Sequence, residues 1–133
     1  MYLLDTNVCI RILNNSSPAL AARLQNLTPD ELCLCSVTKA ELIFGAYNSA
    51  RPAENLRVLQ VFFAPLASLP FDDACADAYG RIRFDLQRQG TSIGGDDMLI
   101  AAIAIANEAV LVTANTREFA RVTGLRLENW EQA

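Results

Sequence analysis

Residues 91–113, TSIGGDDMLIAAIAIANEAVLVT, hold the pattern that narrows the choice of fold most. Two adjacent glycines lead into two adjacent aspartates, then into a nine-residue apolar run and a short apolar strand. A helix this apolar must be covered on nearly all sides, and a strand without polar alternation is buried on both faces. The segment predicts a helix over 96–107 and a strand over 109–113 in a covered parallel sheet.

The rest of the chain alternates strands and helices in the same way. Strands are expected at 2–4, 31–35 and 67–71, with an edge strand near 125–128. Helices are expected at 6–13, 18–27, 37–48, 52–65 and 72–89, with Ser17 and Ser36 as caps, Asp72 at the start of the last and Gly90 closing it. Such alternation predicts an α/β fold with a mostly parallel sheet of four to five strands and helices on both faces. Without repeats or linkers, residues 1–133 are expected to form one domain.

The composition excludes several kinds of chemistry. The chain has no histidine, and Lys39 is its one lysine, so histidine-based catalysis is excluded and amine catalysis is poorly supplied. The four cysteines include no C-x-x-C pair, which favours buried free thiols in a reducing compartment over a zinc site. The start MYLLDTN has no signal-peptide features, and no apolar stretch reaches the roughly 20 residues that span a bilayer. We expect a cytoplasmic protein without a membrane partner, whose main chemical resource is its carboxylates.

Charge is distributed unevenly along the chain. The formal net charge of −4 argues against a general nucleic-acid coat protein. Arginines nevertheless gather in two groups, Arg81, Arg83 and Arg88 in one and Arg117, Arg121 and Arg126 in the other. Since a guanidinium can bind two phosphate oxygens at once, a basic rim around an acidic pit is compatible with this composition.

Asp5 and Glu41 are the first two candidate functional acids. Asp5 directly follows the first strand, where a helix cap and a metal ligand fit equally well. Glu41 lies at the margin of the apolar stripe of its helix, one turn from Val37 and from Phe44. A buried carboxylate must be paired, protonated or bound to a cation, although a glutamate at this margin could also reach water or an arginine.

Asp96 and Asp97 open the apolar helix, and their pairing requires an explanation. Capping and the helix dipole stabilise an aspartate there by about 1 kcal/mol each, but neither requires two. Successive helical residues point about 100° apart, so one is expected to face the strand ends and the other to face solvent or to serve as cap.

Asn115, Thr116 and Glu118 follow the strand that ends at Thr113, where they fit a simple turn or further oxygen donors. The carboxyl ends of parallel strands meet at one edge of a sheet, so these side chains and the acids are expected to gather there. Oxygen donors without nitrogen or sulfur ligands select Mg²⁺ or Mn²⁺, whose main use is phosphate chemistry.

Four stretches, in this order and spacing, resemble the PIN-domain ribonucleases, specifically the VapC toxins of type II toxin–antitoxin systems. They are MYLLDTNVCI, SVTKAELIFGA, RQGTSIGGDDMLIAA and VLVTANTREFARVTGLRLENW. The resemblance implies a PIN-like three-layer sandwich and an Mg²⁺-dependent endoribonuclease, in which Mn²⁺ can substitute. It further implies a homodimer bound by a VapB-type antitoxin in a higher hetero-oligomer.

The resemblance assigns roles by position. It implies that Asp5, Glu41 and Asp97 are the catalytic acids and metal ligands. Asn115 stands where the family more often has a fourth acid, so one firmly held Mg²⁺ and a transient second are expected. Supporting residues are expected to be Thr6, Asn7, Asp96, Thr113, Asn115 and Glu118, and RNA contacts Arg81, Arg83, Arg88 and Arg117.

The same resemblance also indicates a substrate and a partner that would need a docking surface. GRIRFDLQRQG and TREFARVTGLRLENW are most similar to members that cleave initiator tRNA in its anticodon region. Residues 56–63, LRVLQVFF, carry more apolar surface than one buried helix face needs. Core packing can account for this, but we predict that part of the helix docks the antitoxin, which Phe62→Glu would test.

Two other classes of function remain open. A PIN-like protein-binding module with an inactive site is compatible with Asn115, and Mn²⁺-dependent stabilisation that Asp5→Asn abolishes would argue against it. Phosphoryl transfer on a small molecule fits poorly, because Asn7 stands where an aspartate-nucleophile phosphatase needs a second acid. A receiver domain would need a lysine after a late strand, and Lys39 lies too early.

Overall fold

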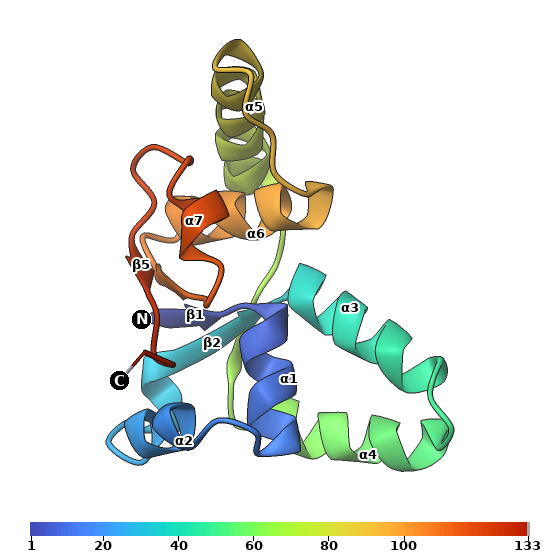
Figure 1. Ribbon diagram of the computed structural model, residues 1–133. Helices are drawn as coiled ribbons and strands as arrows, with labels where there is room; N and C mark the ends of the chain where they lie inside the picture. The colour runs from blue at the N-terminus through green and yellow to red at the C-terminus, as the bar shows by residue number, and fades with distance from the viewer. Residues whose placement is uncertain (133) are drawn as a thin grey trace.

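The computed structural model describes residues 1–132 and contains a five-stranded parallel sheet between two layers of helices (Figure 1). The strand order is β3-β2-β1-β4-β5, and every neighbouring pair is parallel. This confirms the predicted α/β class. The strands are β1 (Tyr2–Leu4), β2 (Leu32–Cys35), β3 (Ala67–Leu69), β4 (Val110–Val112) and β5 (Leu127–Glu128).

The helices follow the predicted segments, with local differences at their ends. They are α1 (Thr6–Asn14), α2 (Pro18–Leu24), the 3₁₀ helix η1 (Pro29–Glu31), α3 (Ser36–Tyr47), α4 (Pro52–Phe63), α5 (Asp73–Arg88), α6 (Gly95–Ala106) and α7 (Thr116–Phe119). Ser17 and Asp72 cap α2 and α5 as expected, by accepting hydrogen bonds from the backbone N–H groups of Leu20 and Cys75.

One predicted cap is wrong. Cys35 holds the N-cap position of α3, so Ser36 is the first helical residue and its side chain cannot cap. For Asp96, expected either to face solvent or to serve as cap, the structure supports the first alternative: Gly94 is the N-cap of α6, and Asp96 is exposed in its first turn. In both cases the backbone enters the helix one or two residues earlier than the polar side chains suggest. The region after β4 also contains α7, where only a turn is expected from sequence.

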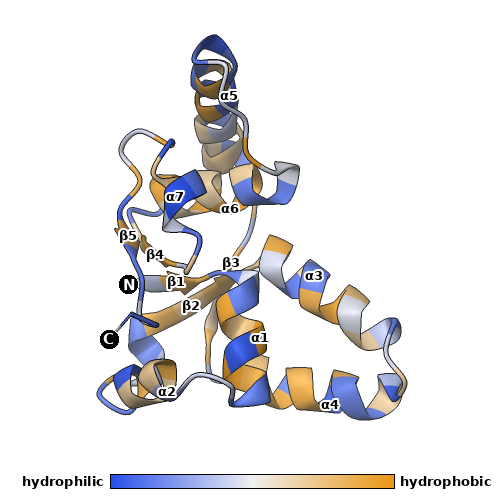
Figure 2. Ribbon diagram, in the orientation of Figure 1, coloured by the Kyte–Doolittle hydropathy of each residue, from blue (hydrophilic) through white to orange (hydrophobic). Residues whose placement is uncertain are grey.

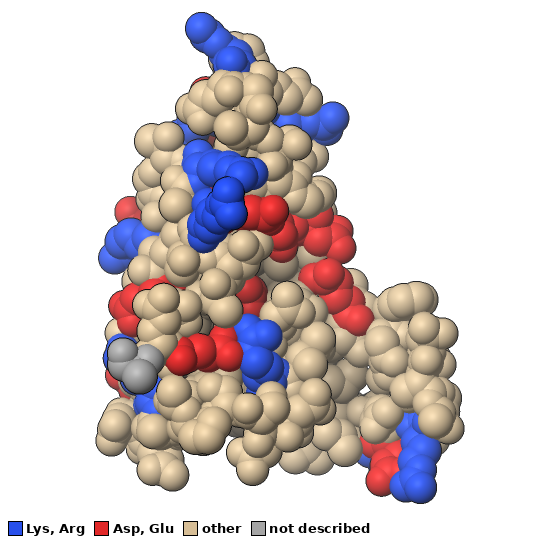
Figure 3. Space-filling view, in the orientation of Figure 1, with Lys and Arg blue, Asp and Glu red and all other residues tan. Residues whose placement is uncertain are grey.

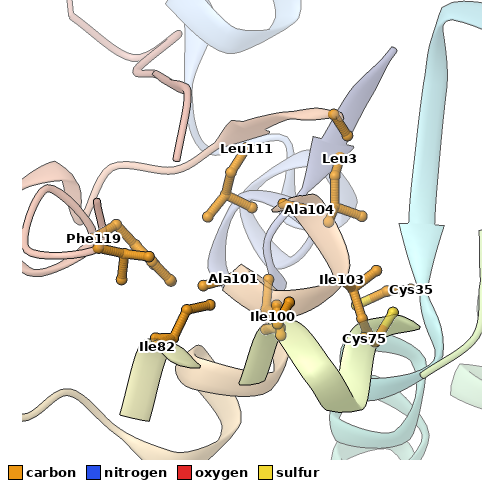
Figure 4. Packing of buried hydrophobic residues seen from close by; sticks show 14 of the residues in the cluster. Leu3, Cys35, Cys75, Ile82, Ile100, Ala101, Ile103, Ala104, Leu111 and Phe119 are labelled. Atoms are coloured by element: carbon orange, nitrogen blue, oxygen red, sulfur yellow. The ribbon is translucent and has the colours of Figure 1, made fainter. Parts of the chain in front are cut away.

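Alternate residues of each strand face opposite layers of helices, as the period of two requires. Leu3, Cys33 and Leu111 pack against α5, α6 and α7, where Phe119 and Ile103 complete the cluster (Figure 4). Leu4, Leu34 and Val112 pack on the other face against α1, α2 and α4. The two apolar clusters confirm that the sheet is covered on both sides.

All four cysteines are buried free thiols, in agreement with the expectation from their spacing. Burial raises the pKa of Cys33 to about 11 and raises the pKa of Cys9 further. Thiols that stay protonated and out of contact with water are poor nucleophiles and poor metal ligands. They act as small apolar side chains of the core.

The sheet topology determines where a ligand can bind. From β1 the chain moves outward through β2 to β3, and it then crosses to the opposite side of β1 to form β4 and β5. The loops after β1 and β4 therefore leave in opposite directions and open a crevice at their carboxyl ends. Asp5 follows β1 and Thr113 follows β4, so both stand at this crevice. Among residues 1–132, no helix is long and apolar enough to cross a membrane.

Candidate active site

Asp5 directly follows β1 at the carboxyl edge of the sheet and is 6% exposed. Its Oδ1 accepts a hydrogen bond of 2.8 Å from the backbone N–H of Val8, so this carboxylate does cap α1. The hydroxyl of Thr113 also hydrogen-bonds to it. Burial raises the pKa of Asp5, and the bonds from Thr113 and Val8 oppose that effect. The two bonds hold the carboxylate rigidly at the end of β1, whatever further ligand it binds.

Asp97 approaches Asp5 from the first turn of α6. Burial raises its pKa first, and the charges of Asp5, Glu118 and Asp96 raise it further. The apolar residues that follow bury the body of α6 in the core, while Gly94, Gly95 and Asp96 at its N-terminus remain exposed. Of the two adjacent aspartates, Asp97 is the half-buried one that lies toward the strand ends.

Glu41 enters the crevice from α3 and is held by Thr6. The Thr6 hydroxyl donates to Glu41 Oε1 over 2.5 Å. Burial raises the pKa of Glu41, the Thr6 bond opposes this, and the neighbouring Asp96 carboxylate raises it again. Asp96 is exposed, but its charge acts on Glu41 across the crevice, which the expectation of a cap did not anticipate.

Asn115 reaches the same edge from the start of α7. Its Nδ2 donates to Glu118 Oε2 over 2.9 Å, and its backbone N–H donates to Thr113 Oγ1 over 2.9 Å. Thr113 thus links Asn115 to Asp5 through a single buried hydroxyl. Asn7, in contrast, is exposed on α1 at the mouth of the crevice.

The predicted basic rim separates into two kinds of arginine. Arg81, Arg83, Arg88 and Arg117 are exposed on α5 and α7. Arg121 and Arg126 instead donate to the backbone carbonyls of Ser92 and Glu108, which fits a structural role. In Figure 3, acidic side chains gather beside the recess between α6 and α3, and basic side chains lie above them over α5 and α7.

The PIN domain family matches residues 2–125 of the chain. A tRNA(fMet)-specific endonuclease VapC from Shigella flexneri is 43% identical over 129 residues, 97% of each chain. The chain belongs to the PIN-domain family and, within it, to the VapC ribonucleases. The resemblance seen in the four sequence stretches is confirmed.

Solved structures agree with this VapC assignment over the whole fold. DNA-bound VapBC from Salmonella typhimurium matches with a TM-score of 0.91 and 40% identity over 97% of both chains. VapBC2 from Rickettsia felis, bound to a DNA fragment from the promoter, matches with a TM-score of 0.90 and 36% identity, covering 97% of this chain and 98% of that one. The predicted three-layer PIN sandwich is therefore confirmed.

PIN-domain nucleases are metal-dependent as a class, and the oxygen donors of the crevice fit a hard divalent cation. No three acidic or cysteine side chains within residues 1–132 converge closely enough to form a complete cation cage. Mg²⁺ needs no such cage, because it keeps several waters and takes only one or two carboxylates directly. Burial raises the pKa values of Asp5, Glu41 and Asp97, and neighbouring carboxylates raise those of Glu41 and Asp97 further, so a bound cation would stabilise their ionised forms.

Thr38 was not singled out from the sequence, although it contacts Thr6 beneath the crevice. Its side chain is completely buried on the first turn of α3 and lies 3.3 Å, oxygen to oxygen, from Thr6. The available signal was its position three residues before Glu41, which places both on one side of the helix. A threonine is so common near a helix start that this spacing alone does not single it out.

The excess of carboxylates predicts an unusual pH dependence of stability. The folded-state pKa values of Asp5, Glu41 and Asp97 lie above their ordinary values of 3.8, 4.5 and 3.8. The folded chain therefore takes up protons first as the pH falls, and the resulting stabilisation is lost as the pH rises through the raised values. In EDTA, we expect these three groups to raise the Tm by a few degrees as the pH falls from 7 toward 4.5, measured by circular dichroism. The rise should be smaller in Asp97→Asn, and an equal rise in this variant would contradict the assignment.

Proposed function

We propose that this VapC-family chain is the Mg²⁺-dependent endoribonuclease toxin of a VapBC module and that it arrests translation by cutting tRNA. The single observation that carries the proposal is that the charges of Asp5 and Asp97 interact at the switch point of a PIN fold, where Asp97 also acts on Glu41 of α3. A carboxylate site of this kind can hydrolyse a phosphodiester without histidine or lysine, in agreement with the composition.

Asp5, Asp97 and Glu41 are the residues that would hold Mg²⁺ or, in its place, Mn²⁺. When bound, such an ion lowers the pKa of water and neutralises charge on the phosphodiester. Asp5 supplies a carboxylate fixed by the Val8 and Thr113 bonds, so little ordering is needed when the ligand binds. Thr6 orients Glu41 from the opposite wall of the crevice.

The neutral side chain of Asn115 favours a site with one firmly held cation over a site with two. Its amide is neutral and is already bonded to Glu118, so it adds no negative charge at the fourth position. A second Mg²⁺ would be held more weakly there and only while the phosphate group of the substrate is present. We propose that Thr113, Asn115 and Glu118 support Asp5 and Asp97, while Asn7 and Asp96 stand at the mouth of the site.

Substrate binding is proposed to use the exposed arginines around the acidic crevice. Arg81, Arg83, Arg88 and Arg117 form no ion pair with any carboxylate of residues 1–132, so their guanidinium groups are available to phosphates. Each such contact releases counterions from RNA, so affinity should fall steeply with salt. The acidic crevice alone would repel RNA, which makes these arginines necessary for productive binding.

Initiator tRNA, cut in the anticodon region, is the proposed substrate, supported by the names of the Shigella flexneri and Salmonella typhimurium relatives. The test is a competition in which purified toxin receives equal amounts of initiator tRNA and elongator methionine tRNA with Mg²⁺. Preferential loss of the initiator species, with the cut mapped to the anticodon loop, is the expected result. Equal cutting of both would remove the substrate assignment while leaving the nuclease in place.

The antitoxin is proposed to lie in a groove between α1, α3 and α4. In Figure 1, α3 and α4 extend together to one side of the sheet, and Figure 2 shows hydrophobic residues on both. The groove has a volume of about 380 Å³ and contains Ile10, Leu42 and Val58, with Glu41 in its wall. A chain segment bound there would reach the active site, which is how a VapB-type partner would block the toxin.

Val58→Glu is expected to weaken antitoxin binding by at least tenfold in isothermal titration calorimetry, because a charge would be buried at the groove. Val58 is 48% exposed on α4, so the free toxin should keep its fold. Phe62, the residue chosen from sequence, is a poor test because it is partly buried against the core, so a charge there would also destabilise the fold. Val61→Glu is the control, since Val61 is 77% exposed on the same helix but does not line this groove. Unchanged affinity in Val58→Glu would contradict the groove assignment.

Large aromatic side chains exposed on α3 and α5 favour self-association of the chain. Phe44 and Tyr47 on α3 and Phe84 on α5 are more than half exposed, which is unusual for aromatic side chains in a monomer. We propose a homodimer that joins a larger complex with antitoxin, and a single PIN domain as its unit. Light scattering of the free chain tests this directly, and a monomeric mass at micromolar concentration would contradict it.

A further inference from the structure

We propose that Thr38 is a positioning residue for Glu41, acting through Thr6 by a chain of hydrogen-bonded hydroxyl groups. The inference rests on the proposed function, because it concerns how the carboxylate of Glu41 is presented in the crevice. Thr38 itself is completely buried and touches neither RNA nor solvent.

The chain of contacts joins two elements that are remote in sequence. Thr6 Oγ1 on α1 lies 2.5 Å from Glu41 Oε1 and 3.3 Å from Thr38 Oγ1, both on α3. Cys35 Sγ lies 3.6 Å from the same Thr38 oxygen. Four side chains are therefore connected in series, from the end of β2 to the active-site crevice.

The donors in this series can be ordered from chemistry. An ionised carboxylate only accepts, so the shortest contact uses the single proton of Thr6. The proton between the two hydroxyls then comes from Thr38, whose oxygen accepts from the Cys35 thiol. Every group donates toward Glu41, and such a one-way series strengthens the bond at its end.

This series of hydrogen bonds restricts the Glu41 side chain to one orientation. A glutamate side chain has several rotatable bonds and costs free energy to order, whereas a β-branched threonine has few rotamers. Thr38 is locked by burial, and it determines the rotamer of Thr6, which holds one carboxylate oxygen of Glu41. Without Thr38, the Thr6 hydroxyl is free to rotate away from the crevice.

The experiment is a Mn²⁺ titration of the full chain, free of antitoxin, followed by calorimetry and paired with tRNA cleavage. Residues that support metal ligands typically change metal affinity by about 10- to 100-fold. We expect Thr6→Val to weaken Mn²⁺ binding by about tenfold and Thr38→Val by about fivefold. In cleavage, kcat should fall with the KM for tRNA unchanged, because no RNA contact is removed.

Three comparisons separate positioning from packing. Thr38→Ser should restore Mn²⁺ affinity to within about twofold of the parent, whereas Thr38→Ala, which differs from it by one oxygen, should not. Thr6→Val/Thr38→Val should be no worse than Thr6→Val alone, because Thr38 acts through Thr6. Thr91→Val is the control, since the Thr91 hydroxyl is buried without a hydrogen-bond partner among the described residues, and its loss should leave Mn²⁺ binding unchanged.

The proposal is overturned by equal Mn²⁺ affinity in Thr38→Ser and Thr38→Ala, or by additive effects in the double variant. If Thr38→Val unfolds, the Ser and Ala pair still gives the answer. A parent protein that neither binds Mn²⁺ nor cuts RNA would contradict the proposed function itself. That outcome is distinct from a functional parent with unaffected Thr38 variants.

Discussion

Asp97→Asn is expected to lower kcat/KM for RNA cleavage by more than about 100-fold and, in EDTA, to raise the Tm. Loss of the charge removes a carboxylate that we propose as a metal ligand and that interacts with the charge of Asp5. The same loss relieves a repulsion, since burial and the charges of Asp5, Glu118 and Asp96 all disfavour the ionised form. One substitution should therefore abolish activity and stabilise the fold.

Opposite changes in activity and stability distinguish a functional acid from a structural one. Asp77→Asn is the matched control, because Asp77 is exposed on α5 and should change neither quantity by much. Cleavage rates under single-turnover conditions and thermal melts in EDTA provide the two readouts. An Asp97→Asn protein that is less stable than the parent, or that still cuts RNA at the parental rate, would contradict the assignment.

Phe119→Ala is expected to lower the free energy of unfolding by about 3–5 kcal/mol, which corresponds to a fall in Tm of about 10–20 °C. Phe119 is 1% exposed and is among the largest fully buried side chains. It packs from α7 onto Leu111 and the α5–α6 layer (Figure 4). Truncation would leave a cavity beneath the helix that carries Asn115 and Glu118.

Val61→Ala is the control for this substitution. Val61 is 77% exposed on α4, so its truncation should change the free energy of unfolding by less than about 0.5 kcal/mol. Urea denaturation of both variants measures the difference. A loss of under about 1 kcal/mol in Phe119→Ala would show that α7 is not an integral part of the core.

The layered fold is predictable from sequence because its signals are local. The helix that contains MLIAAIAIA and the strands YLL and VLV were predicted correctly from sequence. Their burial on both sides leaves continuous apolar runs, which are easy to recognise. Asp5 and Asp97 could be placed near each other by the rule that parallel strands end at one edge. These predictions needed only residue spacing and the alternation of elements.

The rest depends on contacts that no spacing records. Thr6 meets Thr38 and Glu41 across more than thirty residues, so their series appears only once α1 and α3 pack together. Asp96 acts on Glu41 because α6 and α3 lie in contact, which cannot be read from its position at a helix start. Phe62 was chosen as a surface residue, but tertiary packing turned it toward the core and left Val58 and Val61 outside.

The most direct test of the central proposal is cleavage of a total tRNA pool by purified, antitoxin-free chain in Mg²⁺, in EDTA, and in EDTA followed by excess Mg²⁺. Cutting in Mg²⁺ that stops in EDTA and returns when Mg²⁺ is restored is the predicted result. Cutting that continues undiminished in EDTA, or a folded chain that cuts no RNA in Mg²⁺, would contradict it.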